Sequence, residues 1–196
     1  TYIAMRADVL AELEEYELAL HDIDHLLHRE PQSAALHFEK GRICLRSNDT
    51  TCALNAFTRA TEYDSQNPAN WSALGLVQLM QDKQDDALSS LSKSIEHGSK
   101  WAGDYINRGI IYYRKHNYRS ALSDYDKAVS LSPRDAQCYY NRGVLRQELG
   151  DYNRALEDLT QAINFAPDKI EIYYQRALVQ LQLRQWEDAL NDLNTI

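Results

Sequence analysis

The chain has 196 residues, 44% hydrophobic and 26% charged, and its 29 Asp and Glu against 21 Lys and Arg give a net charge of −8. With only 7 Gly and 4 Pro, the composition excludes collagen-like and broadly disordered chains. The acidic balance without a basic block disfavours nucleic acid as a partner, and no apolar run approaches the roughly 18 residues that a membrane span needs. We therefore expect no nucleic-acid partner and no membrane insertion.

The sequence repeats itself every 34 residues without an insertion. The repeats span residues 1–33, 34–67, 68–101, 102–135, 136–169 and 170–196. Counting residue 34 as position one, position 20 is Ala in every repeat, and Leu follows it. These alanines are Ala19, Ala53, Ala87, Ala121, Ala155 and Ala189. The sequence predicts one array, and the missing first Met and the truncated last repeat indicate a fragment of a longer protein.

Each repeat is predicted to form two helices. In chain order, the pattern of apolar residues is interrupted at Pro31, at Gly98 as a left-handed cap, at Pro133 and at Pro167. No strand pattern is present, so the fold class is all-α. Position eight is always small, and we expect it to lie opposite the invariant alanine, where it lets the two helices pack closely. Its residues are Ala7, Gly41, Gly75, Gly109, Gly143 and Ala177.

The pattern resembles the tetratricopeptide repeat over essentially the whole chain. In the fourth repeat the motif places hold Tyr105, Arg108, Gly109, Tyr112, Ala121, Tyr125, Ala128 and Pro133. In the fifth they hold Tyr139, Arg142, Gly143, Arg146, Ala155, Leu159, Ala162 and Pro167. The resemblance implies a right-handed α-solenoid superhelix of stacked helix-turn-helix repeats. It says little about function, because the motif describes packing positions and serves many unrelated partners.

Position seven, usually Leu in this family, is Arg in four repeats, and each Arg is followed sixteen residues later by Asp. The pairs are Arg6 and Asp22, Arg108 and Asp124, Arg142 and Asp158, and Arg176 and Asp192. Where Arg is absent, Asp is absent too: Lys40 is matched by Ala56, and Leu74 by Ser90. We expect structural ion pairs that join the two helices of one repeat, because a paired Arg and Asp tolerate partial burial.

No catalytic constellation or phosphate-binding loop is evident, so we expect neither an enzyme nor a cofactor. The one metal-like cluster, His21, His25 and His28, falls on a polar outer helix face, and we expect no metal there. Cys44, Cys52 and Cys138 are interpreted as free, at least partly buried thiols. Their odd number slightly favours a reducing compartment such as the cytoplasm, although the localisation stays open.

The resemblance implies that the first helices line the concave side of the array through positions 2, 5, 6, 9, 12 and 13. The apolar candidates there are Phe38, Leu76, Ile106, Ile110, Tyr113, Tyr140, Val144, Tyr174 and Leu178, and the amide candidates are Asn107, Asn141 and Gln175. An exposed apolar stripe is typical of a binding site, although part of it could be ordinary packing between repeats. With first helices about 10 Å apart, the three amides could hold an extended peptide at intervals of about three residues.

The carboxylate clamp that binds acidic chaperone tails in one subfamily is absent, because its places hold Ser72, Leu76, Gln137 and Asn141. The leading hypothesis is a non-enzymatic scaffold that binds an extended or helical peptide segment of another protein in its concave groove. The alternative is a regulatory or substrate-recruiting arm of a larger enzyme or of a secretion or envelope assembly. A third hypothesis is self-association through the truncated C-terminal edge, where Leu190 and Leu193 lack a following neighbour.

Overall fold

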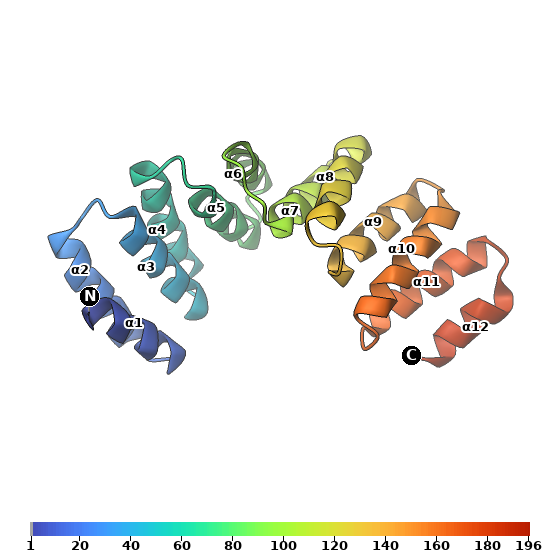
Figure 1. Ribbon diagram of the computed structural model, residues 1–196, viewed down its shortest axis with the longest axis horizontal. Coiled ribbons are helices and arrows are strands. Elements are labelled where there is room, and N and C mark those ends of the chain that lie inside the picture. Colours follow the sequence, from blue (N-terminus) through green and yellow to red (C-terminus); the bar gives the residue numbers. More distant parts are fainter. Residues whose placement is uncertain (1) are drawn as a thin grey trace. The chain divides into compact units, whose positions relative to one another are not determined.

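The computed structural model describes residues 2–196, which form twelve α-helices and no strand (Figure 1). The helices are α1 (Tyr2–Glu12), α2 (Tyr16–Arg29), α3 (Ala34–Arg46), α4 (Thr50–Tyr63), α5 (Pro68–Met80), α6 (Gln84–Glu96), α7 (Ala102–Arg114), α8 (Tyr118–Leu131), α9 (Ala136–Glu148), α10 (Tyr152–Phe165), α11 (Ile170–Gln182) and α12 (Trp186–Asn194). Each repeat is therefore a pair of helices, as the sequence predicts.

Short polar side chains begin many of these helices. Six of them accept a hydrogen bond from a free backbone N–H of the first turn, which offsets the unpaired donors of a helix N-terminus. They are Ser33, Asp49, Asn67, Asn117, Asp135 and Asp151. The turn inside every repeat contains one left-handed residue at position 15, with φ between 56° and 77°. These residues are Glu14, Asn48, Asp82, His116, Gly150 and Arg184. Gly98 has φ 88°, in agreement with the predicted left-handed cap.

The contacts divide the chain into two compact units, the first ending at Ser99 and the second spanning Lys100–Ile196. The first unit holds α1 to α6 and the second holds α7 to α12. Within each unit, the two helices of a repeat pack on each other, and the second helix also packs on the first helix of the next repeat. The core of each unit therefore lies between its helix pairs.

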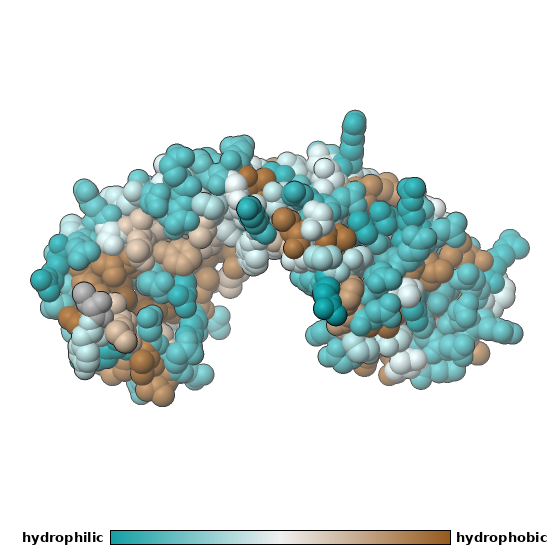
Figure 2. Space-filling model, in the orientation of Figure 1, coloured by the Kyte–Doolittle hydropathy of each residue, from teal (hydrophilic) through white to brown (hydrophobic). Residues whose placement is uncertain are grey.

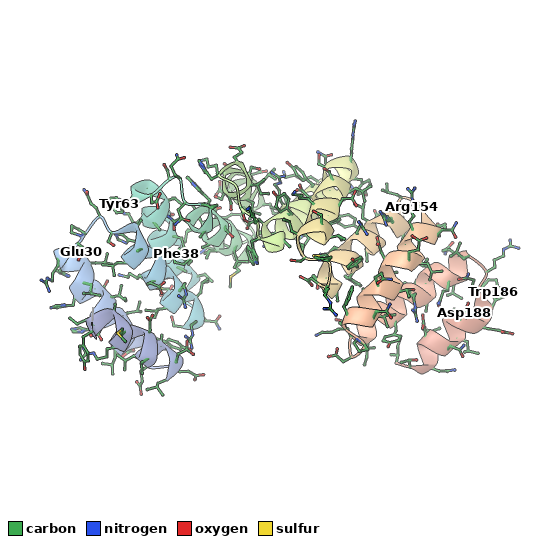
Figure 3. The ribbon with its side chains drawn as sticks, viewed as in Figure 1. Glu30, Phe38, Tyr63, Arg154, Trp186 and Asp188 are labelled. Carbon is green, nitrogen blue, oxygen red and sulfur yellow. A yellow bond between two sulfur atoms is a disulfide. The ribbon has the colours of Figure 1, made fainter. Side chains whose placement is uncertain are left out.

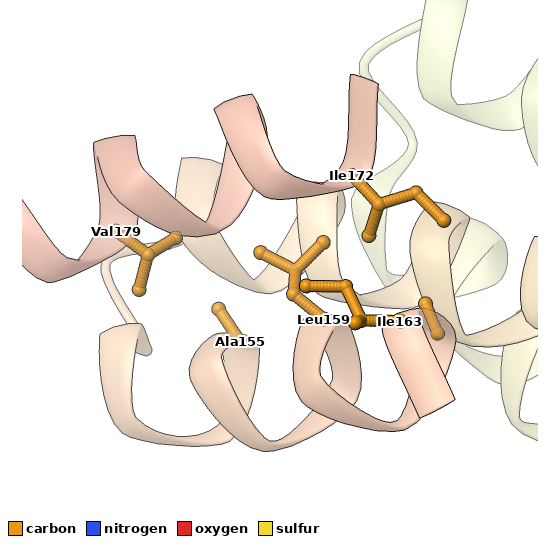
Figure 4. Packing of buried hydrophobic residues seen from close by; sticks show 6 residues of the cluster. Ala155, Leu159, Ile163, Ile172 and Val179 are labelled. Carbon is orange, nitrogen blue, oxygen red and sulfur yellow. The ribbon is translucent and has the colours of Figure 1, made fainter. Parts of the chain in front are cut away.

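The invariant alanines are all buried, and larger side chains fill the space around them. In the second unit, Ala155, Leu159 and Ile163 of α10 pack against Ile172 and Val179 of α11 (Figure 4). Two repeats share this cluster, so burial of apolar surface holds neighbouring repeats together as well as the helices of one repeat.

The glycines of position eight pack against a larger neighbour than expected. A Cβ on Gly41 or Gly109 would lie 2.6 Å from the ring of Phe57 or Tyr125, and one on Gly75 would lie 2.9 Å from Leu91. These neighbours stand at position 24, one helical turn after the invariant alanine. The sequence predicted the alanine opposite the glycine; the nearest atoms belong to the large side chain at position 24, which fills the space over the glycine.

The cysteines also differ from expectation. Cys44, near the end of α3, and Cys52, near the start of α4, form a disulfide across eight residues of sequence. Cys138 is free and buried, and burial raises the pKa of its thiol to about 12. The interpretation of three free thiols is thus wrong for two of them, because the turn of the second repeat brings both sulfur atoms together. The odd-cysteine argument for a reducing compartment no longer holds.

None of the helices in residues 2–196 combines the length and the apolar character needed to cross a membrane.

Candidate functional site

The candidate site lies on the second unit, where the first helices of three repeats stand next to one another. Helix α9 contacts both α7 and α11. We call the surface formed by these three helices the first-helix face. Its residues come from successive repeats, so a ligand that runs across the helices meets the same repeat positions every 34 residues.

Three hollows mark this face. The apolar hollow, about 220 Å³ in volume, is lined by Ile110, Tyr113, Arg114, Tyr125, Tyr140, Asn141 and Val144. The Glu148 hollow, about 350 Å³, is lined by Tyr113, Val144, Gln147, Glu148, Tyr152, Gln175 and Gln182. The Tyr140 hollow, about 270 Å³, is lined by Asp135, Ala136, Gln137, Tyr140, Ala166, Lys169, Glu171 and Ile172. The apolar hollow shares Tyr113 and Val144 with the second and Tyr140 with the third, so it adjoins both of them.

The structure brings together part of the predicted set. Five of its residues line the apolar hollow: Ile110, Tyr113, Tyr140, Asn141 and Val144. Gln175 lines the Glu148 hollow. Asn107, Tyr174 and Leu178 lie on α7 or α11 but line none of the three hollows, and Ile106 is buried.

Phe38 and Leu76 belong to the first unit and to different repeats of it. The Phe38 ring packs edge-on against Phe57 with the ring centres 5.4 Å apart, so it is partly a core residue (Figure 3). For Phe38, the alternative that part of the predicted apolar stripe serves packing inside the array therefore applies.

The side chain of Asn141 is the most informative polar group of the face. Its Oδ1 accepts a hydrogen bond from Gln137 Nε2 at 3.0 Å, whereas its Nδ2 is buried and has no partner. A buried amide donor without an acceptor costs free energy, because it has lost its water and gained no protein partner. An acceptor from a ligand in the apolar hollow would offset that cost.

The three predicted amides are not equivalent. Gln175 Nε2 donates to Gln147 Oε1 at 2.6 Å, so its donor is already engaged within the face. Asn107 is half-buried on α7. All three were expected to hold a peptide backbone, and of the three only Asn141 has a buried donor without a partner.

Glu148, at the end of α9, is held in place by two phenols. Tyr113 Oη and Tyr118 Oη donate to its two carboxylate oxygens, the latter at 2.8 Å, and His116 Nδ1 lies 2.9 Å from Tyr118 Oη. These hydrogen bonds lower the pKa of Glu148, because they stabilise the carboxylate. The same carboxylate raises the pKa of Tyr113 to about 12. At neutral pH the face therefore carries a fixed negative charge at this point.

Sequence reasoning missed most of the polar lining. Arg114, Gln137, Gln147, Glu148, Glu171 and Gln182 all occupy positions 2, 12 or 13, which the resemblance had already assigned to the inner surface. They were left out because an apolar stripe was sought. Tyr125 and Tyr152 come from second helices, and no first-helix pattern could have indicated them.

Each Arg of position seven meets the Asp sixteen residues later. Arg108 Nε and Nη2 donate to Asp124 Oδ2 and Oδ1, both at 2.8 Å, and the other three pairs have the same two-bonded geometry. The four Asp side chains are buried, and Arg6 is the one Arg of the set that is half exposed. Hydrogen bonding to Asp124 raises the pKa of Arg108, and pairing with Arg6 lowers the pKa of Asp22.

A second contact of position seven joins neighbouring repeats. Arg142 Nη1 donates to Asp126 at 2.8 Å, and Lys40 Nζ donates to Asp24 at 2.7 Å. In both cases the acceptor lies sixteen residues earlier, at position 25 of the preceding repeat. Lys40, which has no Asp in its own repeat, therefore has a partner after all.

His21, His25 and His28 are exposed on α2. In the part of the chain that the structure describes, no group of three or more His, Cys, Asp or Glu side chains is arranged to hold a metal ion.

Comparisons with known proteins agree with this architecture. Two family models, both described as tetratricopeptide repeat, match residues 4–51 and 109–168, together more than half of the chain. No curated protein matches the chain in sequence.

Solved structures resemble it over most of its length. YrrB, described as a tetratricopeptide repeat protein with an unusual peptide-binding site, is 17% identical, with a TM-score of 0.76 over 88% of this chain and 89% of that one. A tetratricopeptide repeat protein from Parabacteroides merdae is 17% identical, with a TM-score of 0.80 over 98% and 77%. PilW, described as a type IV pilus biogenesis factor, is 11% identical, with a TM-score of 0.81 over 97% and 89%. Identities this low show a shared fold.

Proposed function

Because the chain belongs to the tetratricopeptide repeat family, whose members are generally non-catalytic interaction scaffolds, we propose that it binds an extended or helical segment of another protein on its first-helix face. The protein has no chemistry of its own in this proposal. It recognises a peptide, and the second unit carries the binding surface.

The observation that carries the proposal is the buried Nδ2 of Asn141, which lines the apolar hollow between its two adjoining hollows. A peptide main chain offers a carbonyl oxygen at every residue, and such an acceptor satisfies the free donor. The apolar side chains around it, Ile110, Tyr140 and Val144, gain from covering by a partner. Tyrosine is also common among residues that dominate binding energy.

The test is a pull-down from a lysate of the source organism with the whole chain and three variants. Tyr140→Ala and Asn141→Ala should each lose the captured protein, because they remove a wall and the free donor of the apolar hollow. Asn164→Ala, the same amide truncation at an exposed position of α10, should capture as the unchanged chain does. Circular dichroism must show equal helicity for all four. Equal capture by all variants would place the binding surface elsewhere.

Self-association is a second proposal, carried by the exposed apolar side chains of α12. Leu190 and Leu193 are 59% and 42% exposed, and Trp186 of the same helix is also exposed (Figure 3). The first unit has a similar surface over α1 and the residue that follows its end, where Met5, Val9 and Leu13 are exposed (Figure 2). If α12 joins two copies, the mass in solution should rise with concentration, and Leu190→Glu should abolish the rise. A constant monomer mass would reject this proposal.

A further inference from the structure

The Glu148 hollow differs from its neighbours in the charge of its lining. Glu148 is the one charged residue among the seven that line it, and the other polar groups are neutral: the amides of Gln147, Gln175 and Gln182 and the hydroxyls of two tyrosines. The adjoining apolar hollow has Arg114 as its one charged residue. The two connected hollows therefore carry opposite charges, and a ligand side chain can distinguish them.

The carboxylate is fixed before any ligand arrives. Tyr113 and Tyr118 each donate to a different oxygen of Glu148, and among the described residues no Lys or Arg forms an ion pair with it. Each oxygen keeps a free lone pair for a further donor. A positioned carboxylate of this kind loses little side-chain entropy when it binds a cation.

The backbone adds to the negative potential. Tyr113, Glu148 and Gln182 lie in the last turns of α7, α9 and α11, which end at Arg114, Glu148 and Gln182. Helix C-termini carry a partial negative charge and favour cations. The rings of Tyr113 and Tyr152 line the same hollow and offer aromatic surface, over which an ammonium or guanidinium group is stabilised.

From these features we infer that the bound segment places a lysine or arginine side chain in the Glu148 hollow, next to an apolar side chain in the apolar hollow. This inference rests on the proposed function, since it names the class of peptide that the first-helix face takes. An acidic or phosphorylated side chain in the Glu148 hollow would meet like charge. The cation is kept out of the apolar hollow by Arg114.

The spacing of the motif follows from the shared wall. Tyr113 and Val144 line both hollows, so the hollows adjoin each other. An extended peptide advances about 3.3 Å per residue, and side chains on one face of it are two residues apart. The basic residue is therefore expected two or three positions from the apolar one.

The experiment selects peptides from a phage-displayed library of random dodecapeptides on the whole chain and on three variants. The unchanged chain should enrich peptides with Lys or Arg at one aligned position, two or three residues from an apolar residue. Glu148→Gln should enrich peptides that lack this basic position. Glu157→Gln, the same change at an exposed site of α10, should keep it, and Asn141→Ala should enrich no family of related peptides.

The affinity of one enriched peptide then measures the coupling between its basic residue and Glu148 in a double-mutant cycle. Replacing its basic residue by norleucine, or replacing Glu148 by Gln, should each weaken binding about tenfold, and the two together should weaken it by no more than about tenfold. Enrichment without a basic position, a basic preference that survives Glu148→Gln, or additive losses would overturn the inference while leaving peptide binding in place. Failure of the unchanged chain to enrich any peptide family would overturn the proposed function and the inference with it.

Discussion

The two units of the chain hold their helix pairs together by different contacts. In the second unit, all three repeats join their helices through an Arg and a buried Asp. In the first unit only the first repeat does so, and the side chain of its Arg6 is 50% exposed. The second repeat has a disulfide between the same two helices, and the third has an uncharged pair in which Ser90 donates to Gln78 at 2.7 Å.

This difference shows which part of the repeat is indispensable. The small residue at position eight and the alanine at position 20 are kept in both units, and buried apolar side chains pack around them in each. The polar link between helices varies from ion pair to disulfide to neutral hydrogen bond. The fold therefore depends on helix packing, and the link adjusts stability.

The largest expected effect comes from breaking an ion pair of the second unit. Arg108→Leu leaves Asp124 buried without its partner, and we expect the free energy of unfolding to fall by about 3–5 kcal/mol. The double change Arg108→Leu with Asp124→Ser removes the buried charge and places at these positions the residue types of the third repeat, Leu74 and Ser90, so it should recover most of the loss. Urea unfolding, with hydrogen exchange of α7 and α8, measures both. A double variant as unstable as the single one would show that the unpaired buried carboxylate is not the cause of the loss.

A smaller effect is expected from opening the disulfide of the first unit. Reduction frees a short loop between Cys44 and Cys52, and the chain-entropy estimate for such a loop is a loss of ~2–3 kcal/mol. Dithiothreitol should lower the urea midpoint of the first unit and leave that of the second unchanged. The Cys44→Ala, Cys52→Ala double variant is the control and should not respond.

Thiol titration of the non-reduced, denatured chain tests the pairing itself. One reactive thiol, that of Cys138, is expected. Three would show that the disulfide does not form.

Replacing a glycine of position eight by alanine should lower stability by a similar amount in both units where an aromatic ring covers the glycine. Gly41→Ala in the first unit and Gly109→Ala in the second each push a Cβ to 2.6 Å from a buried ring, and overpacking should cost about 1–3 kcal/mol. Gly143→Ala meets Leu159 at 3.1 Å, and that side chain can shift more easily. Since Ala also favours the helix by about 1 kcal/mol, its net effect should be near zero in thermal unfolding. Equal losses at all three sites would mean that the ring is not the cause.

The sequence predicted the repeats, their helix pairs and the Arg with Asp spacing, because each of these depends on residues at fixed separations within one chain. The sequence predicted less well which residue of the second helix faces a given residue of the first. Gly41 was expected opposite Ala53, and the pattern did not indicate that the atoms nearest to it belong to Phe57, whose large ring at position 24 reaches over the glycine. The partner of Lys40 was missed for another reason: Asp24 belongs to the preceding repeat, and pairs were sought only within one repeat.

The lining of the proposed binding face was predicted by position better than by residue type. Tyr140, Asn141 and Val144, which were predicted because apolar and amide side chains were sought, line the apolar hollow. Glu148 stands at a predicted inner position, yet its geometry depends on Tyr118 at the start of the preceding helix α8, which no pattern within α9 indicates. Contacts between elements, rather than periodicity within one, decide which polar residues become part of a site.

The smallest expected effect concerns the turn inside each repeat, where both units hold a left-handed residue. Arg184 has φ 60° and Gly150 has φ 77° at the same position. A side chain other than that of Gly is disfavoured in this conformation, so Arg184→Gly should stabilise the second unit by about 1 kcal/mol and Gly150→Ala should destabilise it by a similar amount. In the first unit, Asn48→Gly should change stability less than Asp82→Gly, because Asn tolerates the left-handed region best. Its effect should also be smaller than that of Arg184→Gly in the second unit. Thermal unfolding of the four variants gives the order, and a loss of stability in Arg184→Gly would show that contacts of the Arg side chain outweigh the backbone conformation.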